Sequence, residues 1–210
     1  LFHLVVEAPG IAKMVRPGQF VQVRIGNGLD PFLRRPMSIA RASGGRIDIV
    51  YQMVGKGTKA LSQKGAGENL QMLGPLGNGF TSPPPFSYRN AILIGGGVGI
   101  VSLFPLAEAL EAGRKLFVLI GGKTKTDILC LKDFKKLNSN IFVATEDGSL
   151  GHRGTVIDLF LSKRGKLWGG PPSPIYASGP FGMLKGLARV LASKRFLCEA
   201  SFEARMACGF

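Results

Sequence analysis

A run of three prolines, Pro83–Pro85, divides this chain into two stretches whose apolar residues follow different periods. Before the prolines, short runs such as Phe20–Ile25 and Ile47–Tyr51 alternate apolar and polar residues between turns rich in glycine and proline. A period of two is typical of half-buried strands. Because proline cannot continue a strand or a helix, we expect a domain boundary at this run.

The first stretch predicts an antiparallel sheet with little helical cover. Its only helical candidate is the short segment Thr58–Gln63. Such a sheet must close on itself or pack against another layer to protect its edge strands, which favours a small barrel. We therefore assign residues 1–86 to an antiparallel β-barrel domain.

After the prolines, buried strands alternate with helices. The apolar runs Ala91–Ile94 and Leu116–Ile120 predict strands, and Val101–Ala112, ended by Gly113, predicts the helix between them. This alternation is typical of a parallel sheet covered on both faces, so residues 87–200 form an α/β domain and 201–210 a terminal segment. Further strands are expected at 141–144 and 175–177, and further helices at 127–137, 155–161 and 183–192.

Composition excludes some classes of protein. Of 210 residues, 45% are hydrophobic, which suits a buried core. A net charge of +14 favours an anionic partner: nucleic acid, an acidic protein, a membrane surface or a phosphate-bearing cofactor. No RNA-binding motif or DNA-reading helix is visible, so a nucleic-acid-binding module is a distant alternative. The two histidines, His3 and His152, lie far apart, which argues against hydrolase chemistry.

The three cysteines are too few for a disulfide framework, so a reducing, cytoplasmic compartment is expected. Two of them lie inside apolar segments that are typical of a helix and of a strand, and Cys130 falls in the helix expected at 127–137. The longest uncharged stretch, Ala91–Ala107, contains four glycines and Pro105, so no membrane span is expected. No signal peptide is visible. Because the chain opens on Leu1 and ends at Phe210, within the cysteine-containing motif considered below, we expect it to be clipped at both ends.

Two glycine turns follow strands of the predicted parallel sheet. Gly95–Gly99 lies between a strand and a helix, where missing side chains let a phosphate approach backbone N–H groups. Its spacing is not the usual dinucleotide fingerprint, and a tight turn that packs strand against helix is the alternative. Ser178–Pro180 ends the last predicted strand. Carboxyl ends of parallel strands share one edge, so both turns should face the same crevice.

The first stretch contains two weaker signals. Arg34–Ser38 precedes a strand, and Gly55–Thr58 opens the short helix. An arginine, a hydroxyl and a glycine turn with free N–H groups could together hold a pyrophosphate. Taken singly, an arginine pair is usually a solvated edge and this glycine segment is usually a simple turn.

The order of these motifs resembles the ferredoxin–NADP reductase superfamily, in which a flavin-binding barrel precedes a nicotinamide-binding α/β domain. Within it, Leu73–Phe80, Glu146–Ser149 and above all Glu203–Gly209 are similar to the electron-transfer subunits of type B dihydroorotate dehydrogenase. The similarity covers nearly the whole chain. It implies a subunit of pyrimidine biosynthesis with FAD and a [2Fe-2S] cluster, which passes electrons from an FMN-containing catalytic subunit to NAD, in a heterotetramer.

The resemblance also implies roles for particular residues. Arg35 of the motif Arg35–Ser38 would bind the flavin pyrophosphate, and Ser38 would hydrogen-bond near flavin N5. Ser178 would lie near the nicotinamide, which makes Ser38 and Ser178 the candidate catalytic residues, and Cys208 would be the first cluster ligand. The remaining candidate cofactor-binding residues are Pro36, Met37, Val50, Tyr51, Gln52, Gly57 and Thr58 for FAD, and Gly95, Gly96, Gly97, Gly99, Gly179 and Pro180 for NAD(H).

The chain departs from the superfamily pattern at several positions. Met37 and Ser178 stand where many members have an aromatic residue and a cysteine, and the cluster motif stops two residues after Cys208. A related FAD/[2Fe-2S] subunit of a transhydrogenase, sulfide dehydrogenase or hydrogenase complex is the alternative function. The family points to NAD, although Gly121–Lys123 lacks the acidic residue that would exclude NADP.

Overall fold

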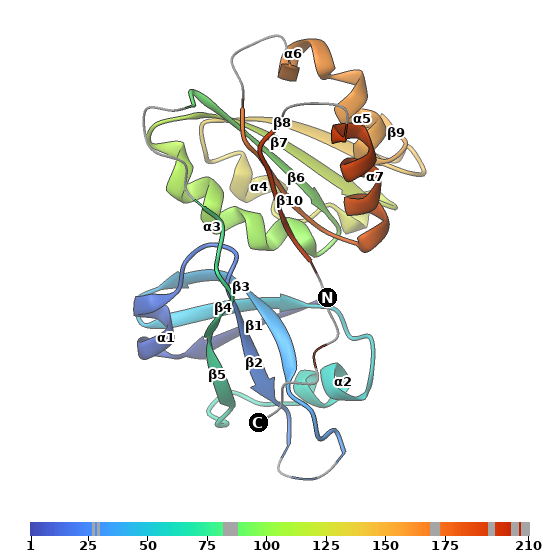
Figure 1. Ribbon diagram of the computed structural model, residues 1–210. Coiled ribbons are helices and arrows are strands. Elements are labelled where there is room, and N and C mark those ends of the chain that lie inside the picture. The colour runs from blue at the N-terminus through green and yellow to red at the C-terminus, as the bar shows by residue number, and fades with distance from the viewer. Residues whose placement is uncertain are drawn as a thin grey trace. The chain divides into compact units, whose positions relative to one another are not determined.

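The computed structural model describes residues 1–26, 28, 30–81, 88–168, 173–192, 196–202 and 206 (Figure 1). The chain divides into two compact units: Leu1–Gly79 with Ala204–Phe210, and Phe80–Glu203. Of the terminal piece only Met206 is described. The expected boundary at Pro83–Pro85 and the candidate ligand Cys208 lie outside the described residues, so the domain limits drawn from the sequence stay predictions.

The described part of the first unit contains an antiparallel sheet of five strands, in the order β1-β4-β3-β2-β5. The two edge strands contribute to a single core: Leu4 of β1 and Met72 of β5 both pack against the cluster that contains Val21 and Ile49. The sheet therefore curls around one interior, as predicted, and Figure 1 shows this curvature. The strands are β1 (Phe2–Glu7), β2 (Phe20–Arg24), β3 (Arg35–Ser43), β4 (Arg46–Tyr51) and β5 (Gln71–Leu76).

Two short helices accompany this sheet, so the expectation of a single helical candidate was wrong. The helix that the sequence missed is α1 (Pro9–Met14), which begins with proline and packs Ile11 and Ala12 against the barrel core. Six residues are too few to show a helical period. The predicted helix is present as α2 (Lys56–Ser62), and Leu61 is its buried anchor.

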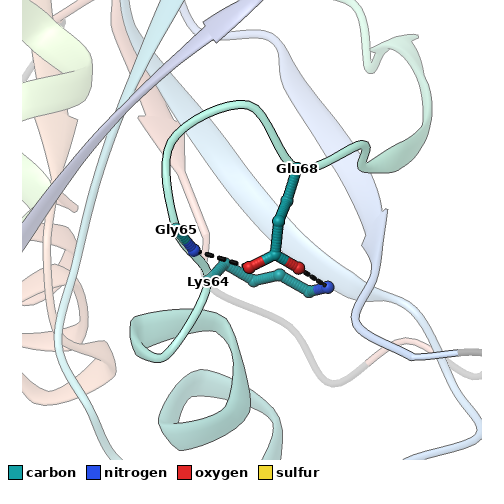
Figure 2. Close-up of polar contacts among 3 residues, drawn as sticks. All are labelled: Lys64, Gly65 and Glu68. Atoms are coloured by element: carbon teal, nitrogen blue, oxygen red, sulfur yellow. Dashed lines mark hydrogen bonds and ion pairs between the residues drawn. The ribbon is translucent and has the colours of Figure 1, made fainter.

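The turn that follows α2 is closed by one carboxylate. Figure 2 shows Glu68 accepting a hydrogen bond from the N–H of Gly65 at 2.6 Å and another from the ammonium of Lys64. The bond from Lys64 and then the bond from Gly65 hold the pKa of Glu68 below its ordinary value. This turn ties the end of α2 to the chain that leads into β5.

The described part of the second unit contains a fully parallel sheet of six strands, in the order β11-β10-β6-β7-β8-β9. The chain builds outward from β6 to β9 and then returns to place β10 on the other side of β6. The boundary between β6 and β10 is therefore a topological switch point, where ligands bind in open α/β sheets. The strands are β6 (Asn90–Gly96), β7 (Lys115–Gly122), β8 (Ser139–Thr145), β9 (His152–Arg153), β10 (Ile175–Ser178) and β11 (Cys198–Ser201).

Helices cover both faces of this sheet, as predicted (Figure 1). On one face, α5 and α7 share a core with Ile92 and Ile94 of β6, while α3 packs on β6, β7 and β10. Residues such as Leu93 on the alternate positions are also fully buried, which explains why these strands are continuous apolar runs. The helices are α3 (Gly99–Glu111), α5 (Val156–Ser162), α6 (Arg164–Trp168) and α7 (Phe181–Leu191).

The helix expected at 127–137 was wrong. The segment forms a 3-10 turn, Lys125–Asp127, and a single helical turn, α4 (Leu131–Phe134). The Asp127 carboxylate accepts the N–H of Thr124 at 2.9 Å, so it caps a turn rather than lying inside a helix. Cys130 adopts a left-handed conformation with φ 55°, so it lies outside the helix that was expected to contain it.

Three short elements of the second unit were also missed, namely α6, β9 and β11 as an element of the sheet. Cys198 is the first residue of β11. In the part of the chain that the structure describes, no helix combines the length and apolar character needed to cross a bilayer.

We expect Glu68 to titrate with a pKa below its ordinary value of 4.5, because Lys64 and Gly65 stabilise its charged form. A depressed folded-state pKa adds stability above the unfolded-state pKa, and this contribution disappears as the pH falls through the folded-state value. Carboxyl chemical shifts followed by NMR between pH 2 and pH 7 would measure this. Lys64→Met should raise the midpoint and Lys59→Met, in the preceding helix α2, should not; equal midpoints in both variants would contradict the assignment.

Candidate functional site

Arg35 and Gly57 meet at the start of α2 in the first unit. A Cβ on Gly57 would lie 2.6 Å from Arg35 Nε, so the guanidinium can occupy this place only because residue 57 has no side chain. The same guanidinium donates to the carbonyl of Leu33. The first N–H groups of a helix have no acceptor within the helix. A fixed cation beside such donors suits a diphosphate.

Thr58 shapes the loop that leads into α2. Its hydroxyl oxygen accepts the N–H groups of Val54 at 2.9 Å and Gly55 at 3.1 Å, and its proton can reach the Gly55 carbonyl at 3.1 Å. The side chain is buried. In this structure the hydroxyl therefore works within the loop, and its contact with a phosphate stays a prediction.

Lys56 is held on the other side of this loop. Its ammonium lies 2.8 Å from Asp30 Oδ2, and this hydrogen bond, together with the charge of Asp30, raises the pKa of Lys56. Both side chains are exposed, so the pair contributes little to stability. Its effect is to direct the lysine toward Asp30 rather than over the Gly57 backbone.

The other predicted flavin residues converge on β3 and β4. Ile39 lies opposite Ile49, which makes Ser38 and Val50 near neighbours across the two strands. Ser38 is exposed, and the exposed Gln52 leads from β4 toward α2. The start of β3, the end of β4 and the start of α2 therefore lie close together in the fold.

Two other predicted flavin-binding residues, Met37 and Tyr51, have side chains that belong to the barrel core. Met37 is only 7% exposed and belongs to the barrel cluster, opposite Val21. Tyr51 is buried and stacks on Phe2, with ring centroids 5.4 Å apart, and burial raises the pKa of its hydroxyl. Pro36, beside Met37, is half-buried opposite Gln22. The side chains of Met37 and Tyr51 support this surface from within.

In the second unit the two glycine turns pack backbone against backbone. Ser178 lies opposite Gly95 on adjacent parallel strands, which brings both turns to the same edge of the sheet, as predicted. A Cβ on Gly99 would lie 2.6 Å from Gly179 Cα, and one on Gly96 would lie 2.7 Å from Met183 Sδ. A Cβ on Gly95 would collide with Ile100. Close packing therefore accounts for these glycines.

Gly97 is different from its neighbours. It has φ +54°, and no atom lies within 4 Å of the position that its Cβ would take. Its N–H donates to the Gly121 carbonyl at 2.9 Å, which fixes the turn. The approach to the backbone is therefore open here, at the N-terminal end of the 13-residue helix α3.

Ser178 is buried and its hydroxyl is engaged. Ser178 Oγ lies 2.9 Å from Ser102 Oγ, which also lies 2.9 Å from the Gly99 carbonyl. A hydroxyl has one proton, so when Ser102 donates to Gly99, Ser178 donates to Ser102. The sequence did not single out Ser102 as a site residue, although its place three residues after Gly99 puts it on the same face of α3.

Known proteins resemble the chain over almost its full length. The electron transfer subunit of dihydroorotate dehydrogenase B (NAD(+)) from Desulforamulus reducens is 39% identical over 211 residues, which cover 99% of this chain and 79% of that subunit. The corresponding subunit of Bacillus caldolyticus is 35% identical, with the same coverage. The chain belongs to this family. It is therefore an oxidoreductase subunit with an electron-transfer role, and the predicted resemblance is confirmed.

Solved structures agree with this family. The NADH-dependent reduced ferredoxin-NADP oxidoreductase, studied for flavin-based electron bifurcation, has a TM-score of 0.84 and 31% identity, over 99% of this chain and 73% of that chain. Ferredoxin-NADP+ reductase from Plasmodium falciparum has a TM-score of 0.76 at 16% identity, over 94% of this chain and 87% of that chain, and shows the shared fold. No family model matches the chain.

Within the described residues, no group of three or more histidine, cysteine or acidic side chains gathers as it would around a metal ion. Cys198 is exposed as a residue. Partial desolvation, followed by the nearby charge of Glu199, raises the pKa of its thiol. Neither Cys130 nor Cys198 belongs to a set of ligands in this part of the chain. The assignment of Cys208 stays a prediction, since that residue is not described.

Gly99→Ala should destabilise the second unit by about 1–3 kcal/mol, because its methyl group would meet the backbone of Ser178 and Gly179 at 2.6 Å. Gly113→Ala is the matched control, since nothing lies within 4 Å of its Cβ position. Urea unfolding followed by circular dichroism measures both. Equal stability of the two variants would show that the turns do not need this close approach.

Proposed function

We propose that this chain binds FAD on its first unit and NAD(H) on its second, and passes electrons between NAD and an FMN-containing subunit that oxidises dihydroorotate. The observation that carries the proposal is the close approach of Arg35 to Gly57 at the start of α2. It fits a dinucleotide pyrophosphate because a guanidinium offers two parallel donors and the helix end adds more. Membership of the family supports the same function.

In this proposal the residues of the first unit hold and orient the flavin. Arg35 and the backbone of Gly57 and Thr58 bind the pyrophosphate. Ser38, exposed at the start of β3, donates or accepts a hydrogen bond near N5, and Val50–Gln52 runs beside the ring. Pro36 and Met37 stiffen the strand that carries them. Bound FAD supplies the two-electron chemistry with nicotinamide and the one-electron chemistry with an iron–sulfur cluster.

The residues of the second unit hold the nicotinamide dinucleotide. Gly97 lets a phosphate approach the N-terminal end of α3, where the helix dipole and N–H groups favour an anion. Gly95, Gly96 and Gly99 keep the turn tight. Gly179 and Pro180 continue from Ser178, whose hydroxyl is oriented by Ser102 beside the nicotinamide. Ser38 and Ser178 therefore act by positioning rather than by covalent chemistry.

The finer parts of the proposal concern the cluster and the partner. Cys208 would be the first of the thiolates that hold a [2Fe-2S] cluster. The partner would be the catalytic subunit of dihydroorotate dehydrogenase in a heterotetramer of pyrimidine biosynthesis. The relatives are named as electron transfer subunits of dihydroorotate dehydrogenase B, and this name implies a catalytic partner subunit.

A second candidate is a related NAD(P)H-oxidoreductase subunit. It is favoured by the 31% identity and TM-score of 0.84 to the NADH-dependent reduced ferredoxin-NADP oxidoreductase. The two functions differ in the electron donor. Co-purification of the natural-length protein followed by anaerobic assay separates them: dihydroorotate-dependent NADH formation supports the first, and reaction with reduced ferredoxin and NADP supports the second.

Arg35→Ala should weaken FAD binding by about 1.5–3 kcal/mol, or roughly 10- to 150-fold, because a charge-assisted pair with the pyrophosphate is lost. Arg46→Ala is the control, since Arg46 at the start of β4 forms an exposed ion pair with Glu7 at the end of β1. Isothermal titration of the apoprotein with FAD measures both variants. A wild-type protein that binds no flavin would refute the function itself, and equal affinities would refute the role of Arg35.

Gly97→Val should abolish reduction of the flavin by NADH while FAD stays bound, because the side chain would fill the open approach and strain a backbone with φ +54°. Anaerobic mixing with NADH, followed at the flavin absorbance maximum, measures this. Gly113→Val, at the end of α3, controls for a general effect on the second unit. Reduction of the Gly97 variant at the wild-type rate would exclude this turn from the nicotinamide site.

A further inference from the structure

The chain passes between its two units twice. It leaves the first unit between Gly79 and Phe80, and it returns between Phe202 and Met206. The return follows directly on β11, whose last residue is Ser201. Both passages therefore involve residues close to the β10–β11 edge of the second unit, and the first of them is fastened there by side chains.

Both backbone polar groups of Thr81 are bonded to that edge. The hydroxyl of Tyr176 donates to the Thr81 carbonyl at 2.9 Å, and the N–H of Thr81 donates to Glu199 Oε2 at 2.8 Å. Tyr176 lies on β10 opposite Glu199 on β11. The ring of Phe80 packs edge-on against that of Tyr176, with centroids 5.7 Å apart. The connection is thus clamped at its first two residues.

Tyr176 is well suited to this contact. Its side chain is 1% exposed, and burial, with the nearby charge of Glu199, raises the pKa of Tyr176 to about 12. The hydroxyl therefore keeps its proton, and hence its role as donor, over the physiological pH range. An unpaired hydroxyl or carbonyl at such a place would cost free energy, so the bond to Thr81 is favoured.

The connection is also held on the side of the first unit. The amide of Gln19 donates to the Gly77 carbonyl at 2.6 Å. Gly79 has φ +71°, and a Cβ there would lie 2.9 Å from the Pro17 carbonyl. Gly77 is therefore bonded within the first unit and Thr81 within the second, and the chain between them passes Pro17 too closely for residue 79 to carry a side chain.

The clamp and the nicotinamide turn share one strand. Ser178 follows Tyr176 by two residues on β10, and the hydroxyl of Ser178 is itself fixed by Ser102. Glu199 lies on β11, and Met206, which belongs to the first unit, accepts a hydrogen bond from the Gln22 amide at its sulfur at 3.4 Å. Displacement of the connection would therefore be transmitted to the turn through a single short strand.

We propose that Tyr176 and Glu199 are positioning residues for hydride transfer, which fasten the connection between the units to the strand that ends in the Ser178–Pro180 turn. This inference rests on the proposed function. Hydride transfer needs the reacting atoms about 3–3.5 Å apart, and a misplacement of about 1 Å costs on the order of 100-fold in rate. The clamp makes the connection and the nicotinamide turn move as one body.

Glu199→Ala and Tyr176→Phe in FAD-loaded protein of natural length test this. Anaerobic stopped-flow reduction over a range of NADH concentrations should show the limiting rate falling at least about 10-fold, with the Kd for NADH changed less than about 2-fold. The long-wavelength absorbance of stacked nicotinamide and flavin should weaken. Glu199→Gln keeps an oxygen acceptor for the Thr81 N–H and should restore most of the rate.

Glu111→Ala is the matched control. The Glu111 carboxylate also accepts a backbone N–H in the second unit, that of Asn138 at 2.9 Å. This variant should reduce its flavin at the wild-type rate. Tyr176→Phe keeps the ring and its contact with Phe80, so it tests the hydroxyl even if Glu199→Ala folds poorly.

Several results would overturn the inference. Wild-type limiting rates in Glu199→Ala and Tyr176→Phe would do so, as would an equal loss in Glu111→Ala or a raised Kd with an unchanged limiting rate. An independent readout is hydrogen exchange at the Thr81 amide, which should accelerate in Glu199→Ala and not in Glu111→Ala. Failure of NADH to reduce the wild-type flavin would instead refute the proposed function.

Discussion

The contact of backbone with backbone between Gly99 and Gly179 is the constraint on which the second unit depends. A single methyl group at Gly99 would lie 2.6 Å from the neighbouring turn, so β6 and β10 can end side by side only with glycine there. That approach sets Ser178 opposite Gly95 and brings Ser102 within 2.9 Å of Ser178. Glycine costs about 0.5–1 kcal/mol in chain entropy at each position, and the close packing offsets this cost.

In the first unit, a glycine likewise allows a close approach, here of a charged side chain. Gly57 has no side chain, and the guanidinium of Arg35 fills the place that a Cβ would take. The barrel core beneath, which includes Met37 and Tyr51, holds the strands that carry the exposed residues. In both units, then, a glycine allows close approach of another group at the end of a strand or the start of a helix. Buried neighbouring residues hold the backbone of that strand or helix in position.

The sequence predicts several strands of this fold well, because strands such as β2 and β4 alternate apolar and polar residues and β6 and β7 are unbroken apolar runs. β2, β4, β6 and β7 lie within two residues of the predicted ranges. Short elements such as α1 and β9 have too few residues to show a period.

The helix expected at 127–137 was wrong because Asp127 caps a turn and Cys130 takes a left-handed conformation, neither of which the apolar pattern reveals. The motifs predicted candidate site residues but could not separate Gly97, which is open, from Gly99, which is packed. The clamp on Thr81 joins residues 95 and 118 positions apart, a relation that no local pattern contains.

The two side chains that depart from the superfamily pattern, Met37 and Ser178, are both buried. Met37 and Ser178 are 7% and 6% exposed, and the hydroxyl of Ser178 is bonded to Ser102. Because flavin and nicotinamide carry the reactive atoms, the protein contributes mainly the distance and orientation between them. A buried residue can change that geometry without taking part in the chemistry. The rate of electron transfer should therefore depend less on which side chain stands at these two positions than on the contacts that hold β3 and β10 in place.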